Sequence, residues 1–534
     1  MSEVLFGQSY YLGFDAKLWQ AMQPYPPLGA MYAASVLRQR GYDVAMFDAM
    51  LAGSEAEWEE ALERHQPRYA VLYEDNFNYL SKMCLLRMRE AAFTMIGMAR
   101  AHNCTVVVAG ADATDHAELY LAAGANFAVL GEGEQSLAEL MDCLTGKSAT
   151  RGCDNAVLEC HHPNLLLFPL KDGVAREQAG TSHFIVSSAP RVMVNVHEIS
   201  GLAYRDAAPG GGIARTAGRS DIEDLDSLPF PAWDLIDVPR YKDIWRRRHG
   251  NFSLNMVTSR GCPFHCSWCA KPIWGQRHHT RTPENVVAEM LWLKETYQPD
   301  HISFADDIFG LTPGWIQRFA DLVQQQSVGM PFKCLQRADL LLRGDTIPAL
   351  KRAGAQMVWL GAESGSDRVL KAMDKGILVD QIREAARRLH EAGIEIGFFL
   401  QFGYPGEWRA DIDETFRMVR DCRPDDIGVS VSYPLPGTPF YNAIKLQPGA
   451  KQNWTDSADL DLMYQGSYPA AFYRKLHGIL HKEFRSRKVW DDLRQLARRP
   501  FSLRKRHLRQ GAAMVYYAGT LPFDRRRLRR LEQA

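Results

Sequence analysis

Short apolar runs alternate with amphipathic segments through the first 150 residues. Strands that alternate with helices predict a doubly wound parallel sheet, because each crossover helix covers one face of the sheet. We therefore expect an α/β, Rossmann-like domain over residues 1–150. Its strands are expected at residues 4–6, 42–47, 69–73, 105–109 and 127–130.

A second series of strand and helix patterns follows a proline-rich connector. The apolar runs recur at intervals of roughly 25 to 45 residues, which fits one strand and one helix per unit. Together with a strand expected just ahead of residue 260, they predict a partial (β/α)6, TIM-like barrel over residues 246–440. The expected strands are 301–304, 332–335, 357–360, 394–402 and 427–433, and the expected helices include 283–296, 315–325 and 380–392.

Two segments lie outside these predicted domains. Residues 151–245 have a mixed pattern and are expected to form a connector between the sheet and the barrel. Residues 441–534 contain amphipathic stretches at 474–487 and 490–499, which predict a helical carboxyl-terminal region.

The charges of the chain are segregated although they cancel. The 63 Lys and Arg residues balance 63 Asp and Glu residues, but residues 1–150 carry net −9 and residues 471–534 carry net +13. The basic end has three candidate partners: an anionic membrane surface, nucleic acid and the acidic first domain. We favour peripheral contact with the inner face of a membrane, and nucleic acid is not the expected partner.

The composition narrows the class of protein. Apolar residues at 46% and charged residues at 24% exclude a disordered or fibrous chain. The first residues lack a signal-peptide pattern, and no stretch reaches the about 18 to 20 apolar residues of a spanning helix. In such a chain the ten cysteines are expected to be thiols or metal ligands, and the expected location is the cytoplasm.

Glycines and polar residues follow several predicted strands of the first domain. In parallel sheets, ligands bind at the carboxyl ends of the strands, and glycines there let backbone approach a large flat ligand. No GxGxxG and no Walker-type loop is present, which argues against a dinucleotide. The residues concerned are Gly29, residues 74–76, residues 110–112 and residues 131–134.

Three cysteines share one short loop directly after the first strand expected in the barrel. Cys262, Cys266 and Cys269 have the spacing C-x3-C-x2-C. Three thiolates can hold three irons of a [4Fe–4S] cluster and leave the fourth iron open. A zinc site is the alternative, and it would take a fourth ligand from His265, His278 or His279.

These motifs together resemble one known family. Trp268 precedes the last cysteine, PPLG stands at residues 26–29, GEGE at residues 131–134 and YPLPGT at residues 433–438. The chain thus resembles the cobalamin-binding-domain radical SAM proteins, which include class B radical SAM methyltransferases and anaerobic magnesium-protoporphyrin monomethyl ester cyclases. The DxHxxG motif is absent, so a histidine from that motif is not the expected lower ligand of cobalt.

The resemblance implies three cofactors and their contacts. These are a [4Fe–4S] cluster on the three cysteines, S-adenosylmethionine in the barrel and cobalamin on the first domain. The implied contacts to S-adenosylmethionine are Trp268, Asp306, Asp307, Glu363, Ser364, Arg368, Gly397 and Gln401. The implied contacts to cobalamin are Leu28, Gly29, Asn76, Gly110, Ala111, Gly131 and Glu132.

The resemblance also implies a reaction. The expected enzyme uses a 5′-deoxyadenosyl radical to methylate an unactivated carbon of a small molecule or lipid, with flavodoxin or ferredoxin as the reducing partner. An oxidative cyclase, or another radical rearrangement of a tetrapyrrole-like substrate, is the enzymatic alternative. An RNA-modifying or nucleic-acid-binding protein that uses the basic tail is the alternative from another class, and a zinc-binding scaffold without catalysis is a third.

Overall fold

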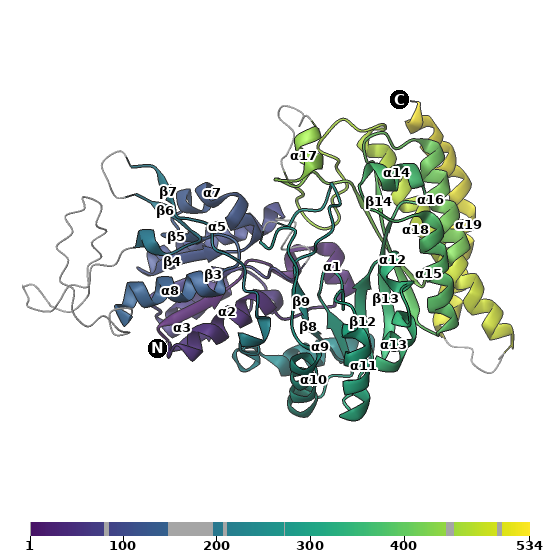
Figure 1. Ribbon diagram of the computed structural model, residues 1–534. Helices are drawn as coiled ribbons and strands as arrows, with labels where there is room; N and C mark the ends of the chain where they lie inside the picture. Colours follow the sequence, from purple (N-terminus) through teal and green to yellow (C-terminus); the bar gives the residue numbers. More distant parts are fainter. Residues whose placement is uncertain are drawn as a thin grey trace, which may run out of the picture.

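The computed structural model describes residues 2–78, 85–147, 196–206, 211–271, 273–444, 453–498 and 505–533 (Figure 1). Much of the expected connector, from residue 148 to residue 195, lies outside the described residues.

The first sheet has seven strands in the order β2-β1-β3-β4-β5-β6-β7. The first five pair in parallel, as expected, and the last two pair antiparallel at one edge. The two edge strands come from the segment expected to be a connector, so the sheet continues past residue 150. The strands are β1 (Val4–Gly7), β2 (Val44–Met46), β3 (Tyr69–Tyr73), β4 (Thr105–Ala109), β5 (Phe127–Val129), β6 (Leu202–Arg205) and β7 (Ile213–Arg215).

Helices cover both faces of this sheet. Alternate residues of one strand enter different cores: Leu72 packs with α3 (Ala56–His65) and α5 (Leu86–Ala101), and Val71 packs with α2 (Leu28–Gln39) and α8 (Glu134–Thr145). This period of two explains why the strands are apolar throughout, since both faces are buried. The shorter helices are α1 (Ala16–Ala21), α6 (Ala111–Asp115) and α7 (Ala117–Ala122).

The second sheet has six parallel strands in the order β15-β14-β13-β12-β11-β8. This is the partial barrel expected from the sequence. A two-stranded antiparallel ribbon, β9 (Ser259–Arg260) with β10 (His279–Thr280), brackets the cysteine loop. The six strands are β8 (Ser253–Met256), β11 (His301–Phe304), β12 (Phe332–Gln336), β13 (Ala355–Glu363), β14 (Glu395–Phe402) and β15 (Asp426–Val431).

Helices cover the outer face of the barrel. The helix α10 (Pro283–Tyr297) shows how the sequence starts such an element, since Thr282 accepts a hydrogen bond from Asn285 N and Pro283 occupies the first turn. The other helices of this part are α9 (Val238–His249), α11 (Trp315–Gln325), α12 (Ala338–Leu341), α13 (Thr346–Ala353), α14 (Asp367–Ala372), α15 (Val379–Glu391), α16 (Arg409–Cys422) and α17 (Pro439–Ala443).

Two long helices, α18 (Ala470–Arg498) and α19 (Lys505–Glu532), form an antiparallel pair on the side of the barrel away from the first domain (Figure 1). The two amphipathic stretches, which would suit two separate helices, form one helix that ends at Arg498, because no glycine or proline stands between them. No helix in the described part of the chain is long and apolar enough to cross a membrane.

Candidate functional site

The carboxyl edges of the two parallel sheets meet at the cysteine loop. Phe77, after β3, stacks on Trp274 of that loop with ring centroids 5.3 Å apart. Asn255 on β8 donates to the backbone oxygen of Pro26 at 2.9 Å. Loops from both domains, where ligands bind in such sheets, therefore face one another.

The three cysteines form the centre of this junction. Cys262, Cys266 and Cys269 are free thiols and are half-buried. The loop is closed by Lys271 Nζ, which donates to the backbone oxygens of Cys262, at 2.6 Å, and Phe264. Burial raises the pKa of the Cys269 thiol to about 12, so a bound cation would be needed to hold it as a thiolate.

The donor types in the loop fit an iron–sulfur cluster better than zinc. Three thiols within eight residues supply three sulfur ligands. In the described residues, no three His, Cys, Asp or Glu side chains already gather closely enough to hold an ion. The fit therefore rests on the kind and spacing of the donors and not on a closed set of four ligands.

Several barrel strands fasten the cysteine loop. Ser267 N donates to Met373 O at 2.9 Å, and the Ser267 hydroxyl lies 3.0 Å from the Tyr404 hydroxyl. The Arg337 guanidinium stacks on the Phe264 ring at 3.6 Å. The loop is thus held from the ends of β12 and β14 and from the segment after α14.

A buried ion pair lies beside the loop. Lys375 Nζ is 2.9 Å from Glu363 Oε1 and 5.9 Å from the centroid of the Trp268 ring. Glu363 has the left-handed backbone conformation, with φ of 57°, at the end of β13. Arg337 donates to the backbone oxygen of Lys375 at 2.8 Å. Glu363 therefore lies by the loop, together with two cations, Lys375 and Arg337, to which the motifs assigned no role.

One of the two cations left a weak signal in the sequence. Arg337 directly follows the strand β12, where a buried cation needs an anionic partner. Lys375 follows Asp374 after the short helix α14, so its position in the sequence does not mark it in the same way.

The adjacent carboxylates Asp306 and Asp307 have different surroundings. Asp306 is buried, and one oxygen accepts from Thr258 N at 2.9 Å and from the Ser259 hydroxyl at 2.6 Å. Burial raises its pKa to about 6. Asp307 is exposed. Burial of the Cys269 thiol is the main cause of its raised pKa, and the negative charge of Asp307 raises that pKa further. Asp306 thus shapes the turn into the loop, whereas Asp307 faces the cysteines.

The inner face of the barrel is lined by alternate residues of its strands. Gly397 lies under the Trp359 ring, and a Cβ atom at that glycine would be 2.3 Å from the ring. The ring of Trp359 stacks on Phe399 at 4.6 Å, and Phe399 is 37% exposed. Gln401 Oε1 is buried with no hydrogen-bond partner among the described residues. This orphaned polar atom and the exposed aromatic wall are features expected of a cavity that receives a ligand.

Two expected contacts lie away from this inner face of the barrel. The Ser364 hydroxyl is 3.2 Å from the Thr415 hydroxyl of α16, within the helical layer. Arg368 pairs with Asp411 and donates to Gly406 O at 2.7 Å, and its side chain is largely exposed. The structure does not bring these two residues to the cysteine loop.

The expected cobalamin residues gather at the carboxyl edge of the first sheet. Gly29 packs against the end of β3, where its N donates to Asp75 Oδ1 at 3.1 Å. Gly110 and Gly131 both have positive φ, of 127° and 75°, so the chain turns tightly after β4 and β5. Leu28 and Ala111 are buried beside them, and Asn76 Oδ1 is buried with no hydrogen-bond partner among the described residues. Glu132 instead points to the barrel, where it pairs with Arg260.

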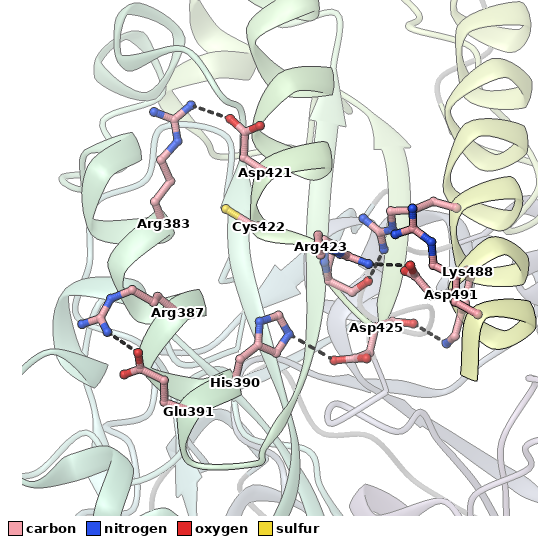
Figure 2. A pocket seen from close by; sticks show the side chains of 13 residues that line it. Arg383, Arg387, His390, Glu391, Asp421, Cys422, Arg423, Asp425, Lys488 and Asp491 are labelled. Atoms are coloured by element: carbon pink, nitrogen blue, oxygen red, sulfur yellow. Dashed lines mark hydrogen bonds and ion pairs between the residues drawn. The ribbon is translucent and has the colours of Figure 1, made fainter. Parts of the chain in front are cut away.

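A large cavity of about 970 Å³ lies elsewhere, between α15, α16 and α18 (Figure 2). It opens where α15 and α16 end, which is the amino-terminal end of the barrel strands and opposite the cysteine loop. Its charges pair with one another, as in Arg423 with Asp491 at 2.5 Å and His390 with Asp425 at 3.6 Å. We do not assign the chemistry to this cavity.

Comparison with known families identifies two domains. Residues 20–141 match the B12 binding domain, and residues 256–419 match the radical SAM superfamily. The two domains that the motifs implied are thereby confirmed.

Relatives of known sequence cover part of the chain. An uncharacterized methyltransferase of Pyrococcus horikoshii is 27% identical over 49% of this chain and 56% of its own length. An anaerobic magnesium-protoporphyrin IX monomethyl ester cyclase of Rubrivivax gelatinosus is 26% identical over 48% of this chain and 45% of its own length. The chain thus spans about half the length of these curated relatives.

Solved structures share the fold. The methyltransferase TsrM from Kitasatospora setae, with cobalamin and a [4Fe–4S] cluster bound, superposes with a TM-score of 0.59 at 17% identity and covers 82% of this chain and 77% of that one. The cobalamin-dependent radical enzyme OxsB has the same TM-score and identity and covers 78% of this chain and 52% of that one. The order of the α/β domain, the partial barrel and the helical end is confirmed.

Proposed function

We propose, from the B12 binding domain at residues 20–141 and the radical SAM domain at residues 256–419, that this chain is a radical enzyme dependent on cobalamin and S-adenosylmethionine. Its reaction is the methylation of an unactivated carbon in a small molecule or lipid. Methyltransferases are among the relatives by sequence and by fold, which favours this reaction over the oxidative cyclisation that other relatives are named for.

The observation that carries the proposal is the meeting of the two carboxyl edges at the cysteine loop. The contact of Phe77 with Trp274, at 5.3 Å, closes this junction from the first domain. A ligand on the edge of one sheet would then lie close to a ligand in the mouth of the other, as transfer of a group between them requires.

The residues of the chain have these proposed tasks. Cys262, Cys266 and Cys269 hold a [4Fe–4S] cluster, Asp307 and Gln401 line the cavity for S-adenosylmethionine, and Gly110 and Gly131 lie under cobalamin. When bound, the cluster supplies the electron that cleaves S-adenosylmethionine, and cobalamin carries the methyl group to be transferred. The electron comes from a reducing partner such as flavodoxin or ferredoxin. The fit is supported by the unpartnered Gln401 and Asn76 oxygens.

The proposed domain limits follow the same assignment. Residues 1–150 form the cobalamin-binding domain, 151–245 the connector, 246–440 the radical SAM barrel and 441–534 the basic helical region. The antiparallel strands β6 and β7, which come from within the connector, extend the sheet of the first domain.

The test is anaerobic reconstitution with iron, sulfide and cobalamin, followed by an assay for 5′-deoxyadenosine after reduction. We expect about four irons and one cobalamin per chain, and 5′-deoxyadenosine that depends on added S-adenosylmethionine. A chain that takes up zinc and yields no 5′-deoxyadenosine would contradict the proposal and support a metal-binding scaffold.

The helix α19 is the part of the chain that supports contact with a membrane. Val515 and Phe523 on its outer face are 70% and 68% exposed, and Tyr516, 60% exposed, lies at the edge of that face, where its ring is 5.2 Å from Lys482 Nζ of α18. Arg526 and Arg530 continue the same face at helical spacing and are exposed. The opposite face packs on α18, where Lys482 Nζ is 2.6 Å from Asp524 Oδ2. An apolar stripe beside arginines suits the surface of an anionic bilayer.

A vesicle flotation assay tests this contact. The full chain is expected to float with vesicles that contain phosphatidylglycerol and much less with phosphatidylcholine alone, and the triple variant V515S/Y516S/F523S is expected to bind about tenfold less. The variant Leu378→Ser, at a similarly exposed apolar position on the barrel, is the control. Binding that is indifferent to lipid charge would contradict the contact, and salt-sensitive binding to RNA instead would favour the nucleic-acid alternative.

A further inference from the structure

A buried ion-pair triad joins the two domains. Arg260 stands on β9, two residues before Cys262, and its guanidinium reaches across to the GEGE turn of the first domain. Nη2 lies 2.8 Å from Glu134 Oε1, and Nη1 pairs with Glu132 Oε1. All three side chains are 3% exposed. The partners are separated by 128 and 126 residues in sequence.

Aromatic rings enclose the guanidinium. The centroids of Tyr32, Phe77 and Trp274 lie 5.4, 5.5 and 5.9 Å from its central carbon. Tyr32 and Phe77 belong to the first domain, and Trp274 belongs to the cysteine loop. Trp274 Nε1 also donates to Glu132 Oε1 at 3.1 Å. The triad is therefore shielded from water by rings from both edges, and the backbone N of Ile222 in the connector also donates to Glu132 Oε2.

Stability alone does not explain such a triad. Removing three side chains from water costs about as much free energy as their attraction returns, and apolar replacements are often as stable. A guanidinium held by two carboxylates is instead rigid, because its planar fork fixes both distance and direction.

The geometry after Arg260 passes this rigidity to the cysteines. Gly261 has φ of 79°, and a Cβ atom there would lie 2.2 Å from the backbone oxygen of Arg277. The backbone at Gly261, at the start of the cysteine loop, therefore packs tightly against the backbone at Arg277, at the end of the loop. A shift of the Arg260 backbone would be passed directly to Cys262.

We infer that Arg260, Glu132 and Glu134 are positioning residues that set the distance between the cluster loop and the cobalamin edge. This inference rests on the proposed function. Glu132 then acts through Arg260 and not as a contact to cobalamin. The triad would keep the two cofactors at one separation, on which transfer between them depends.

Hydrogen exchange on the cofactor-free chain gives the first test. The variant Arg260→Gln is expected to speed amide exchange about tenfold or more in residues 259–262 and 131–134, because the joined edges open more often. The variant Glu134→Gln retains the ion pair between Arg260 and Glu132, and a smaller increase in the exchange rate is expected. This milder variant provides a result even if Arg260→Gln folds poorly. The control is Arg277→Gln, which removes the pair between a 57% exposed arginine of the same loop and the buried Asp221. Exchange that rises equally in R277Q, or in neither variant, would overturn the inference.

Electron paramagnetic resonance on the reconstituted chain gives the second test. With cob(II)alamin and the reduced cluster both present, both centres are paramagnetic, and the spin–spin interaction between cobalt and the cluster reports their separation. R260Q is expected to weaken that interaction, or to spread it over a range of distances, while the iron and cobalamin contents stay the same. Arg260→Lys is expected to restore part of the interaction. An unchanged interaction overturns the positioning role, whereas a wild-type chain that loads neither cofactor refutes the proposed function itself.

Discussion

Replacing Cys262, Cys266 or Cys269 by Ala is expected to lower the iron content of the reconstituted chain from about four atoms to below about one. Formation of 5′-deoxyadenosine should fall below detection in the same samples. The physical reason is that each thiol supplies one of only three protein ligands on the loop, and the described residues gather no substitute around them. Iron analysis and chromatography of the quenched reaction measure both effects.

A matched cysteine provides the control for this experiment. Cys334 lies on β12 and is fully buried, and burial is the main cause of its strongly raised pKa. Because Cys334 lies on a strand of the barrel and not on the cysteine loop, C334A should keep both its iron and its product. Cleavage of S-adenosylmethionine that persisted in C262A would contradict the assignment of the cluster.

Replacing Lys375 by Met is expected to lower the free energy of unfolding by about 3 to 5 kcal/mol, because it leaves the Glu363 carboxylate buried without its cation. Both side chains are less than one-tenth exposed, so water cannot substitute for the lost partner. Urea denaturation of the cofactor-free chain, followed by fluorescence, measures the change.

The double variant K375M/E363Q separates the cost of the unpaired charge from the loss of packing. Removing the charge as well should restore most of the lost stability, since a neutral pair needs less solvation. A loss in K375M below about 1 kcal/mol, or no recovery in the double variant, would show that the pair is not buried as the structure has it.

Local patterns in the sequence predicted most of the fold. The strand expected at residues 301–304 coincides with β11, and the helix expected at residues 315–325 coincides with α11. Such elements can be predicted because apolar spacing and flanking residues determine strand and helix over a few turns. The cysteine loop was predicted for the same reason, since its spacing lies within eight residues.

The arrangement of the candidate site was harder to predict. Glu363 and Asp307 were expected at the site and do lie by the cysteine loop, whereas Ser364 and Arg368 lie in the helical layer. Neighbouring residues at the end of a strand point to different sides, and the left-handed turn at Glu363 decides which of them face the barrel.

By itself, the sequence determined the two α/β units, their order, the thiol loop and a basic end, because each depends on the spacing of nearby residues. Only the tertiary structure decided which partners these residues meet. Nothing in the local sequence distinguishes Arg260 from other arginines, and only the fold brings it to Glu132, which is 128 residues away in the chain. Lysine is usually a surface residue, and only the fold buries Lys375 beside Glu363. Both pairings depend on burial, between the two domains for Arg260 and within the barrel for Lys375, which local sequence does not record.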